Sequence, residues 1–252
     1  MCGRYAASRS AEDLMIIYEA VDDAPEPSRP EPEGPVPEPV ADNLQPNYNV
    51  TPTSPVPVIR TRTRDARRVV SVARWGLLPH WAPDERAGAR FINARAETVA
   101  TLPAFRSAFA RRRCLVPADG WFEWRRDPDG AGRQVLFMTP QDGAGVSFAG
   151  LWEVWPGPHG RRLTCSILTT EAVGDLRDVH DRMPLLLPPS RYAAWLDPST
   201  DDPAEMLRPP AEDLVGALEI RRVGAAVGNV RAVGPELVAP YAAPVAAAQT
   251  LF

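Results

Sequence analysis

Residues 112–124 read RRCLVPADGWFEW, and this stretch shows the pattern that indicates the fold class. The β-rich segment Cys114–Pro117 ends at an Asp-Gly pair, which is typical of a turn, and a run of large side chains follows. The same pattern recurs elsewhere, where Gly, Pro and Asp separate further short β-rich segments. These segments are Pro55–Arg60, Arg68–Arg74, Gln134–Met138, Val146–Trp152 and Leu163–Thr169. Repeated short strands predict a domain built on a β-sheet.

Helical periodicity is convincing at only a few places. Ser10 precedes apolar residues at helical spacing and is a typical helix cap, so we expect a short helix after an N-terminal strand. Further helices are expected at Pro103–Arg112, Ser190–Leu196 and Ala204–Leu218. The balance predicts an α+β fold, in which a curved, largely antiparallel β-sheet or barrel is flanked by short helices in a single domain.

The chain has 252 residues, and we expect one domain over residues 1–238. Residues 24–46 interrupt it with a stretch that is dense in Pro and Glu and poor in aromatic side chains. Such a stretch cannot bury enough apolar surface to offset its ordering entropy, so it is interpreted as a disordered surface insertion. Residues 239–252 are rich in Ala and Pro and are expected to form a loose tail.

The composition excludes several classes of protein. No apolar run approaches the roughly 18–20 residues of a membrane span, and the first residues lack the apolar stretch of a signal peptide. We therefore expect a protein of the cytoplasm, associated with the nucleoid when bound to DNA, and a monomer by default. The three Cys and three His residues lack metal-ligand spacing. Neither a metal nor an organic cofactor is expected.

The chemistry of the chain is limited by its basic residues. All 28 of them are Arg, so the N-terminal α-amine is the only primary amine. Any Schiff base with an aldehyde must then form at the N-terminus. The net charge is −4, but residues 19–42 contain eight acids and one Arg, which leaves a positive balance on the rest of the chain. Arg clusters at 60–64, 111–113 and 125–126 are compatible with phosphate contacts.

Cys2 is the sharpest candidate for a catalytic residue. Removal of Met1 would leave a thiol and a free α-amine on adjacent carbons. An aldehyde reacts with such a pair first at the amine, giving an imine, and then at the sulfur, closing a five-membered thiazolidine. The α-amine has an ordinary pKa near 8, so a useful fraction of it is neutral and nucleophilic at cellular pH.

Two further side chains are candidates for general acid and base catalysis. His180 lies in the polar stretch VHDRMP before an apolar run, where the edge of a strand is expected to present it. Glu123 lies between large rings that would desolvate its carboxyl group and raise its pKa. The alternative interpretations are a structural, hydrogen-bonded His and a half-exposed strand Glu.

Other polar and aromatic residues suit the binding of a nucleic acid strand. Alternation in FINARAET places Asn93, Arg95 and Glu97 on one face of a strand, so that Asn93 orients an amine or hydroxyl and Arg95 holds a phosphate. The stretch WGLLPHWA, from Trp75, places rings beside a Gly-Pro turn, as a stacking platform for an unpaired base requires. A role for these Trp residues in the core is equally consistent with the sequence.

Taken together, these segments resemble the SOS response-associated peptidase (SRAP) family, whose members crosslink to abasic sites in DNA. The matching blocks run in the family's order from residue 1 to about residue 238 and do not depend on a single motif. They are MCGRY, PNYNVTPT, WGLLPHWA, FINARAETV, RRCLVPADGWFEW, FAGLWE, VHDRMPLLL and AVGNV. Two departures are the long Pro/Glu-rich insertion and a His80-Trp81 pair where the family has two aromatic residues.

The resemblance implies a DNA-damage function and assigns roles by motif. It implies that Met1 is lost by self-processing and that Cys2 then forms a thiazolidine with an abasic site in single-stranded DNA. The implied catalytic residues are Cys2, Asn93, Glu123 and His180, with Glu123 and His180 assisting sugar ring opening and proton transfer. The implied DNA-binding residues are Arg4, Asn47, Trp81 and Arg95. Weak abasic-site lyase activity is an expected side reaction.

Two other functions remain open from the residues alone. Cys2, His180 and Glu123 are also compatible with an N-terminal cysteine hydrolase that acts on peptide or amide substrates. Alternatively, the chain is a passive single-stranded DNA-binding module in which Cys2 is incidental. Such a module binds intact and abasic strands equally and forms no complex that survives denaturation.

Overall fold

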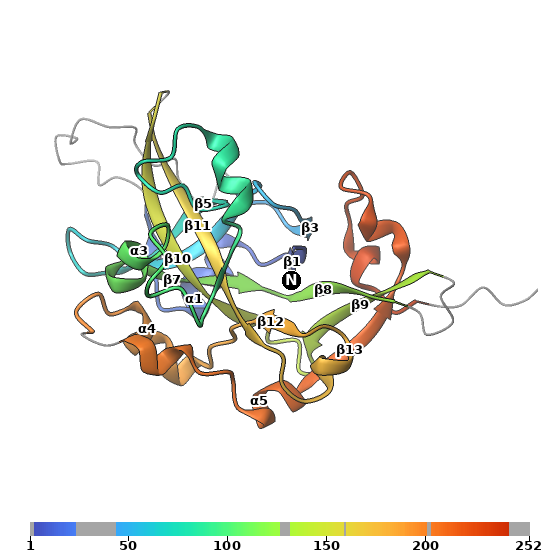
Figure 1. The fold of residues 1–252 in the computed structure, drawn as a ribbon. Helices are drawn as coiled ribbons and strands as arrows, with labels where there is room; N and C mark the ends of the chain where they lie inside the picture. The colour runs from blue at the N-terminus through green and yellow to red at the C-terminus, as the bar shows by residue number, and fades with distance from the viewer. Residues whose placement is uncertain (1–2, 24–43, 127–131, 159, 201–202, 242–252) are drawn as a thin grey trace, which may run out of the picture.

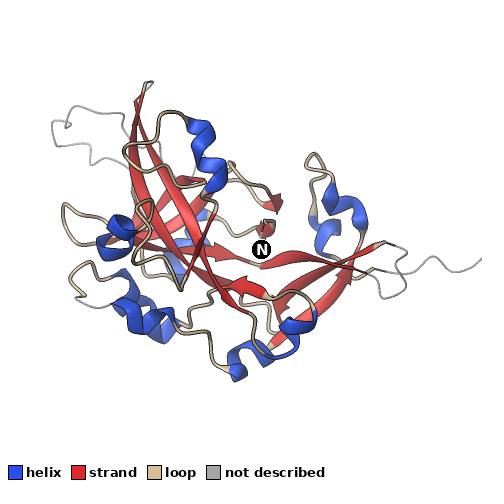
Figure 2. Ribbon diagram, viewed as in Figure 1, coloured by secondary structure: helices blue, strands red, loops and turns tan. Residues whose placement is uncertain are grey.

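The computed structural model describes residues 3–23, 44–126, 132–158, 160–200 and 203–241 (Figures 1 and 2). Its strands are β1 (Tyr5–Ala7), β2 (Val21–Asp22), β3 (Asn47–Val50), β4 (Pro55–Thr61), β5 (Arg68–Trp75), β6 (Asn93–Arg95), β7 (Arg113–Ala118), β8 (Gly120–Arg126), β9 (Arg133–Pro140), β10 (Val146–Gly157), β11 (Gly160–Glu171), β12 (Arg182–Pro184) and β13 (Leu218–Val223). Its α-helices are α1 (Ala11–Ile17), α3 (Arg106–Arg111), α4 (Tyr192–Leu196) and α5 (Glu212–Gly216). Short 3-10 helices are η1 (Glu85–Arg90), η2 (Gly174–Asp178), η3 (Pro189–Arg191), η4 (Pro203–Leu207), η5 (Ala225–Gly228) and η6 (Pro235–Val238).

Within these described residues the strands form a closed barrel and a second, antiparallel sheet. Strands β11, β10, β7, β4 and β5 pair in that order, and the parallel pairing of Cys165 on β11 with Trp75 on β5 closes the ring. The second sheet has the order β13-β9-β8-β1-β3. Its β8, β9 and β13 extend away from the barrel in Figure 1. The predicted α+β class with a curved sheet or barrel is therefore confirmed.

The stretch RRCLVPADGWFEW is where the chain passes from the barrel to the second sheet. Its first part is barrel strand β7, and its second part is β8. Gly120 is required at the crossing because a Cβ there would collide with the carbonyl oxygen of Met138 on the neighbouring β9. Asp119 fixes the same corner, since its Oδ2 accepts a hydrogen bond from the backbone N–H of Ser8 at 2.7 Å.

Aromatic side chains join the two sheets into one core. The ring of Tyr5 on β1 makes edge contacts with Trp75 at a centroid distance of 5.2 Å and with Phe148 at 5.7 Å. Trp121 on β8 packs edge-on against the same Phe148 ring. All four side chains are buried. Burial of such large rings contributes strongly to stability and fixes β1 against the barrel.

Several predicted elements are present with small changes at their ends. The helix after Ser10 is α1, and Ser10 and Asp13 form a reciprocal capping box. The helix expected at Pro103–Arg112 is the shorter α3, and that expected at Ser190–Leu196 is η3 followed by α4.

The single helix predicted at Ala204–Leu218 is wrong. The chain forms η4, breaks at Pro209 and Pro210, and resumes as α5, after which Leu218 begins β13. Two consecutive prolines cannot donate helical hydrogen bonds, and they disfavour helical backbone at the preceding residue, so the apolar periodicity does not yield one helix. Residues 24–43 and 242–252 lie outside the described residues, so the interpretations of the insertion and the tail stay predictions.

Candidate active site

Glu123 is a buried carboxyl group on β8. Its side chain is 5% exposed, and the neighbouring strand residue Phe122 is fully buried. Burial, with a smaller contribution from the negative charge of Asp181, raises the pKa of Glu123 to about 7. A carboxyl group with this pKa exchanges a proton near neutral pH, as a general acid and base must. The burial expected for Glu123 is present, although the adjacent Phe122 and Trp124 lie on the opposite face of β8.

His180 lies between η2 and β12, at the polar turn that the sequence indicated. Its Nδ1 accepts a hydrogen bond from the backbone N–H of Arg182 at 2.9 Å. Partial burial is the main cause that lowers the pKa of His180. Because Nδ1 accepts this hydrogen bond, it carries no proton, and the proton of the neutral imidazole is on Nε2. His180 therefore offers an N–H donor at a fixed ring nitrogen.

Asp181 also approaches the His180 ring, and the two contacts at Nδ1 compete. The Asp181 Oδ1 lies 2.7 Å from Nδ1, which is attractive only if Nδ1 bears a proton. The Arg182 N–H cannot donate to a protonated Nδ1. The Asp181 side chain is 85% exposed and free to turn into solvent, whereas the backbone N–H of Arg182 is fixed, so the neutral ring with the Arg182 contact is the favoured state.

Strand β11 lies between the strand that carries Asn93 and Arg95 and the strand that follows His180. Its residue Ile167 pairs with Asn93 on β6, and Thr169 pairs with both Arg95 on β6 and Pro184 on β12. The predicted alternation holds at Asn93 and Arg95, which are more exposed than the buried Ala94 between them. Glu97, predicted on the same strand face, lies beyond the end of β6 in a series of turns.

Glu97 and Arg182 connect the two segments that flank β11. The Arg182 guanidinium donates two hydrogen bonds to the Glu97 carboxylate at 2.7 and 2.9 Å, and a third to the carbonyl oxygen of Thr169. This bidentate pair holds the segment after Arg95 against the beginning of β12. Arg182 was not among the candidates from sequence, although it belongs to the same VHDRMP motif as His180.

Cys2, the predicted nucleophile, lies outside the described residues, but the strand that follows it points toward Glu123. Tyr5 pairs with Trp121 in antiparallel register, and the carbonyl oxygen of Arg4 accepts from the N–H of Phe122 at 2.9 Å. In this antiparallel register, residues that precede Tyr5 lie opposite residues that follow Trp121 on β8, in the direction of Glu123.

The two other cysteines do not suit nucleophilic catalysis. Cys114 and Cys165 are free thiols, and both are fully buried inside the barrel. Burial raises the pKa of each thiol above its ordinary value. A thiol in such a site stays protonated and inert.

Arg4 is held on the face of the second sheet by neutral acceptors. Its Nη1 donates to Asn49 Oδ1 at 2.7 Å and to the Val227 carbonyl oxygen at 2.6 Å. The guanidinium also lies 5.9 Å from the centre of the Trp124 ring. Its predicted role as a phosphate ligand stays a prediction, and Asn49 is a partner that the sequence did not single out.

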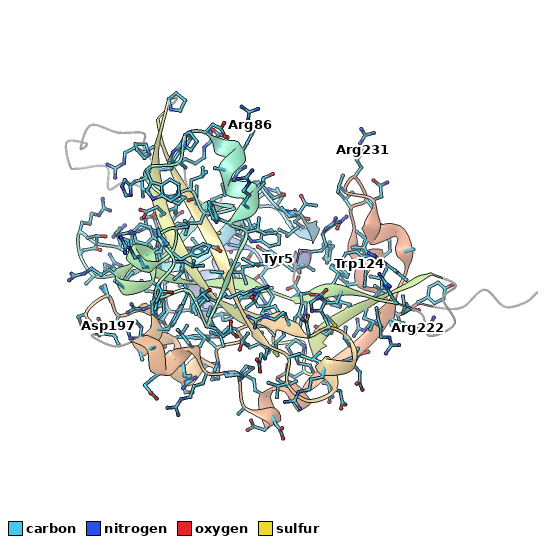
Figure 3. All side chains as sticks on the ribbon, viewed as in Figure 1. Tyr5, Arg86, Trp124, Asp197, Arg222 and Arg231 are labelled. Carbon is cyan, nitrogen blue, oxygen red and sulfur yellow. The ribbon has the colours of Figure 1, made fainter. Side chains whose placement is uncertain are left out.

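Trp81 and Asn47 occupy different surroundings. The Trp81 side chain is 53% exposed, as a stacking platform requires, whereas Trp75 of the same stretch belongs to the core and donates its Nε1–H to the Ile92 carbonyl oxygen. Asn47 begins β3 and lines a cavity of about 330 Å³ between β3, β4 and the segment that contains Val230. Arg86 and Arg231 project outward from two parts of the molecule (Figure 3).

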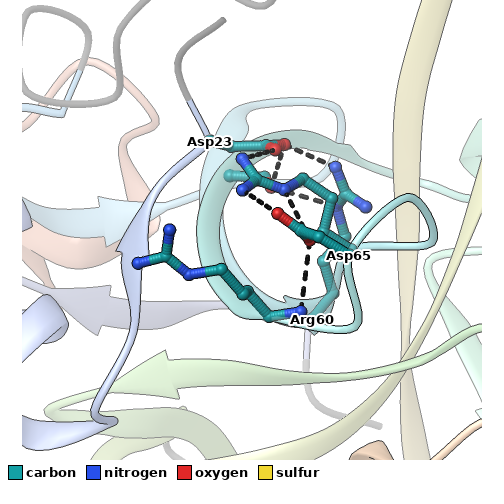
Figure 4. A network of polar contacts seen from close by, with 6 residues as sticks. Asp23, Arg60 and Asp65 are labelled. Carbon is teal, nitrogen blue, oxygen red and sulfur yellow. Dashed lines mark hydrogen bonds and ion pairs between the residues drawn. The ribbon is translucent and has the colours of Figure 1, made fainter. Parts of the chain in front are cut away.

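Some residues of two of the three Arg clusters serve the fold, whereas Arg64 and Arg111 are exposed. Arg60 and Arg62 make ion pairs with the buried Asp23, and Arg62 also pairs with Asp65 (Figure 4). Arg113 is buried and donates to the backbone carbonyl oxygens at the end of α3 and around Trp195. Arg60, Arg62 and Arg113 therefore use these donors inside the protein. The compatibility of the clusters with phosphate contacts stays a prediction. Arg125 and Arg126 are exposed.

Two further properties concern the described part of the chain only. None of its helices is long and apolar enough to cross a membrane. No group of three or more His, Cys, Asp and Glu side chains in the same residues is arranged to hold a metal ion.

Comparison with known proteins identifies the family. The model of the family described as SOS response associated peptidase (SRAP) matches residues 1–230. The chain belongs to the SRAP family. All eight residues predicted as catalytic or DNA-binding fall within the matched part. The match confirms the resemblance drawn from the short sequence blocks.

Relatives of this SRAP chain occur in bacteria and mammals. The abasic site processing protein YoqW of Bacillus subtilis is 33% identical over 244 residues, which cover 94% of this chain and 99% of YoqW. The abasic site processing protein YedK of Escherichia coli is 31% identical, with 95% of this chain and 100% of YedK covered. The abasic site processing protein HMCES of Rattus norvegicus is 29% identical, with 79% of this chain and 66% of HMCES covered.

Solved structures share the SRAP chain's fold. A protein from Bacteroides thetaiotaomicron superposes with a TM-score of 0.77 at 25% identity and covers 96% of this chain and 100% of its own. A protein from Bordetella bronchiseptica superposes with a TM-score of 0.66 at 28% identity and covers 88% of this chain and 100% of its own.

Proposed function

We propose that this SRAP chain processes abasic sites in single-stranded DNA by forming a covalent thiazolidine crosslink through Cys2 after removal of Met1. The observation that carries the proposal is the environment of Glu123, a buried carboxyl group with a pKa of about 7 toward which the N-terminal strand leads. The names of YoqW, YedK and HMCES as abasic site processing proteins support the same substrate.

The reaction begins with opening of the abasic sugar. The cyclic hemiacetal must lose the proton of its hydroxyl group while the ring oxygen gains one, and this releases the aldehyde. Glu123 suits this exchange because both of its protonation states are populated near pH 7. The Nε2–H of a neutral His180 donates a hydrogen bond to the sugar oxygens, since Nδ1 is occupied by the N–H of Arg182.

The crosslink then forms in two bond-making steps. The Cys2 amine adds to the aldehyde carbon, and the carbinolamine loses one water molecule to give an imine. Glu123 donates the proton that the departing hydroxyl needs. The Cys2 sulfur then adds to the imine carbon, the thiol proton passes to the nitrogen, and the thiazolidine ring closes. The whole process joins protein and DNA with loss of one water.

Other residues are proposed to bind the DNA strand or to orient the reacting groups. Asn93 is proposed to orient the amine or the sugar hydroxyl, Arg4 and Arg95 to hold phosphates, and Trp81 and Asn47 to line the path of the strand. Met1 is proposed to be removed by the protein itself. This is a hydrolysis of the Met1–Cys2 peptide bond, which consumes one water molecule and uses the same Glu123 and Cys2. An imine that does not close to the ring undergoes slow β-elimination, which gives a weak lyase activity.

Denaturing electrophoresis of the protein with a labelled single strand tests the proposal. The expected result is a band that survives denaturation with an abasic strand, but not with an intact strand or with Cys2→Ser. Glu123→Gln is expected to slow its formation by about 10²–10⁴-fold, the usual contribution of a general acid or base. A protein that binds both strands equally without such a band is a passive binding module. Turnover of added peptides without such a band would instead make it a hydrolase.

A further inference from the structure

Asn49 is a buried polar side chain whose amide oxygen and both amide hydrogens are hydrogen-bonded. The side chain is 4% exposed, on β3 beside β1. Its Oδ1 accepts from Arg4 Nη1 at 2.7 Å, and its Nδ2 donates to the carbonyl oxygens of Asn229 at 3.0 Å and Ala232 at 2.9 Å. The orientation of the amide is fixed by chemistry, because a guanidinium only donates and a carbonyl oxygen only accepts.

These bonds connect Arg4 to the C-terminal arm, which we define as residues 218–241. The arm consists of β13, η5, η6 and the loops between them, and Figure 3 labels Arg222 and Arg231 on it. Arg4 reaches the arm directly at the Val227 carbonyl oxygen and indirectly through Asn49, which bonds the loop after η5. Residues more than 220 positions apart in the chain are thereby joined at one guanidinium.

The contacts to Asn49 and Val227 orient the Arg4 guanidinium through neutral groups. Asn49 and the Val227 carbonyl are neutral dipoles, and both use Nη1, so together they fix the plane of the guanidinium. Partial burial lowers the pKa of Arg4, but a guanidinium remains protonated at any cellular pH. A desolvated cation in a fixed orientation attracts an anion more strongly than a mobile surface Arg does.

We propose that Asn49 is a positioning residue for DNA binding, which holds Arg4 in the orientation that receives a strand phosphate and ties that contact to the C-terminal arm. The inference rests on the proposed function, in which Arg4 binds a phosphate of the DNA strand next to the reacting N-terminus. Asn49 itself acts through Arg4 and does not need to touch DNA. Preorganisation of this kind improves affinity because the binding step no longer has to order the side chain.

A double-mutant cycle on Asn49 and Arg4 tests the inference. The affinity for an intact single strand is measured at several salt concentrations for the wild type, Asn49→Ala, Arg4→Ala and the double variant. Each single variant is expected to weaken binding about tenfold, the order of a lost charge-assisted hydrogen bond. Each is also expected to reduce the slope of log K against log salt by about 0.7, the contribution of one phosphate contact on a single strand.

The coupling between the two positions is the decisive quantity. In the Arg4→Ala background, Asn49→Ala is expected to cause no further loss of affinity, since the side chain that it positions is gone. Losses that add would overturn the inference, and so would an unchanged salt slope in Asn49→Ala beside a reduced slope in Arg4→Ala. Asn49→Asp serves as a second variant of equal size if Asn49→Ala does not fold. Its carboxylate pairs with Arg4 and neutralises it, so the same reduction in slope is expected.

Ser147→Ala is the matched control. Ser147 is also a buried strand residue, and its hydroxyl bonds to Tyr18 at 2.7 Å and Tyr192 at 2.6 Å, in a network that does not include Arg4. It is expected to lose thermal stability while keeping the affinity and salt slope of the wild type. A salt slope that does not change in Arg4→Ala overturns the inference but leaves the crosslinking test intact. Absence of both binding and crosslinking in the wild type means that the proposed function itself fails.

Discussion

The backbone N–H of Arg182 donates to Nδ1 of His180 over 2.9 Å, and this bond determines which nitrogen of the imidazole can act on a substrate. The same Arg182 fixes its own side chain on Glu97 and on the Thr169 carbonyl oxygen. One residue therefore sets the tautomer of the histidine and also anchors the segment that bears it. Such supporting contacts are what keep a catalytic group in a productive geometry.

The tautomer of His180 is directly measurable. In a ¹⁵N-labelled protein, long-range correlation spectra should show an unprotonated Nδ1 and a protonated Nε2 at neutral pH. The titration midpoint should lie below the ordinary value of 6.5, because partial burial disfavours the charged ring. A protonated Nδ1 at pH 7 would mean that the Asp181 contact, and not the Arg182 N–H, controls the ring.

The pH dependence of stability should reveal the buried Glu123. Its pKa is raised in the folded state, so folding favours the protonated form, and stability falls as pH rises from about 4.5 through about 7. Glu123→Gln stays neutral and does not suffer this loss. Relative to the wild type, its thermal midpoint should therefore be higher at pH 8 than at pH 4, with a free-energy difference of about 3 kcal/mol at most. A difference independent of pH would show that Glu123 titrates normally.

Trp81 should contribute to DNA binding without contributing to stability. Its ring is half exposed, so Trp81→Ala is expected to leave the thermal midpoint nearly unchanged. Loss of a stacked base would weaken single-strand binding by about 1–3 kcal/mol. Ile16→Ala, at an exposed apolar residue on α1, is the control and should change neither quantity. Equal affinities for Trp81→Ala and the wild type would remove Trp81 from the binding surface.

Asp23 should matter for the fold and not for DNA. Its buried carboxylate pairs with Arg60 and Arg62 and accepts from Ser71, so Asp23→Ala leaves buried charges uncompensated. Chemical denaturation should show a loss of about 3–5 kcal/mol. Arg86→Ala removes an exposed pair with Asp84 and leaves the Asp84 cap of η1 in place, so it should leave stability nearly unchanged. A small effect of Asp23→Ala would mean that the network is not important for stability.

Short β-rich segments made the barrel predictable, because alternation and turn residues act locally. The closure between Trp75 and Cys165 and the strand β13 were not predictable in the same way, since they depend on partners far along the chain. The helix expected at Ala204–Leu218 failed because apolar periodicity outweighed the evidence of Pro209 and Pro210.

The candidate site also combines features that local sequence determines with features that depend on distant residues. Glu123 and His180 were accessible from sequence because their neighbours already specify burial and a polar turn. Asn49 was not, because its importance depends on carbonyl oxygens near the other end of the chain. The internal contacts of Arg60 and Arg113 were not predictable for a related reason, because their buried acceptors come from distant segments.

Intact mass spectrometry of the purified protein, alone and after incubation with a single strand containing one abasic site, tests the central claim most directly. The predicted result is loss of Met1, followed by an adduct whose mass is the sum of protein and strand minus one water. The adduct should be absent with Cys2→Ser and with an intact strand. A protein that has lost Met1 and binds the abasic strand, yet shows no mass increase, would contradict covalent processing at Cys2.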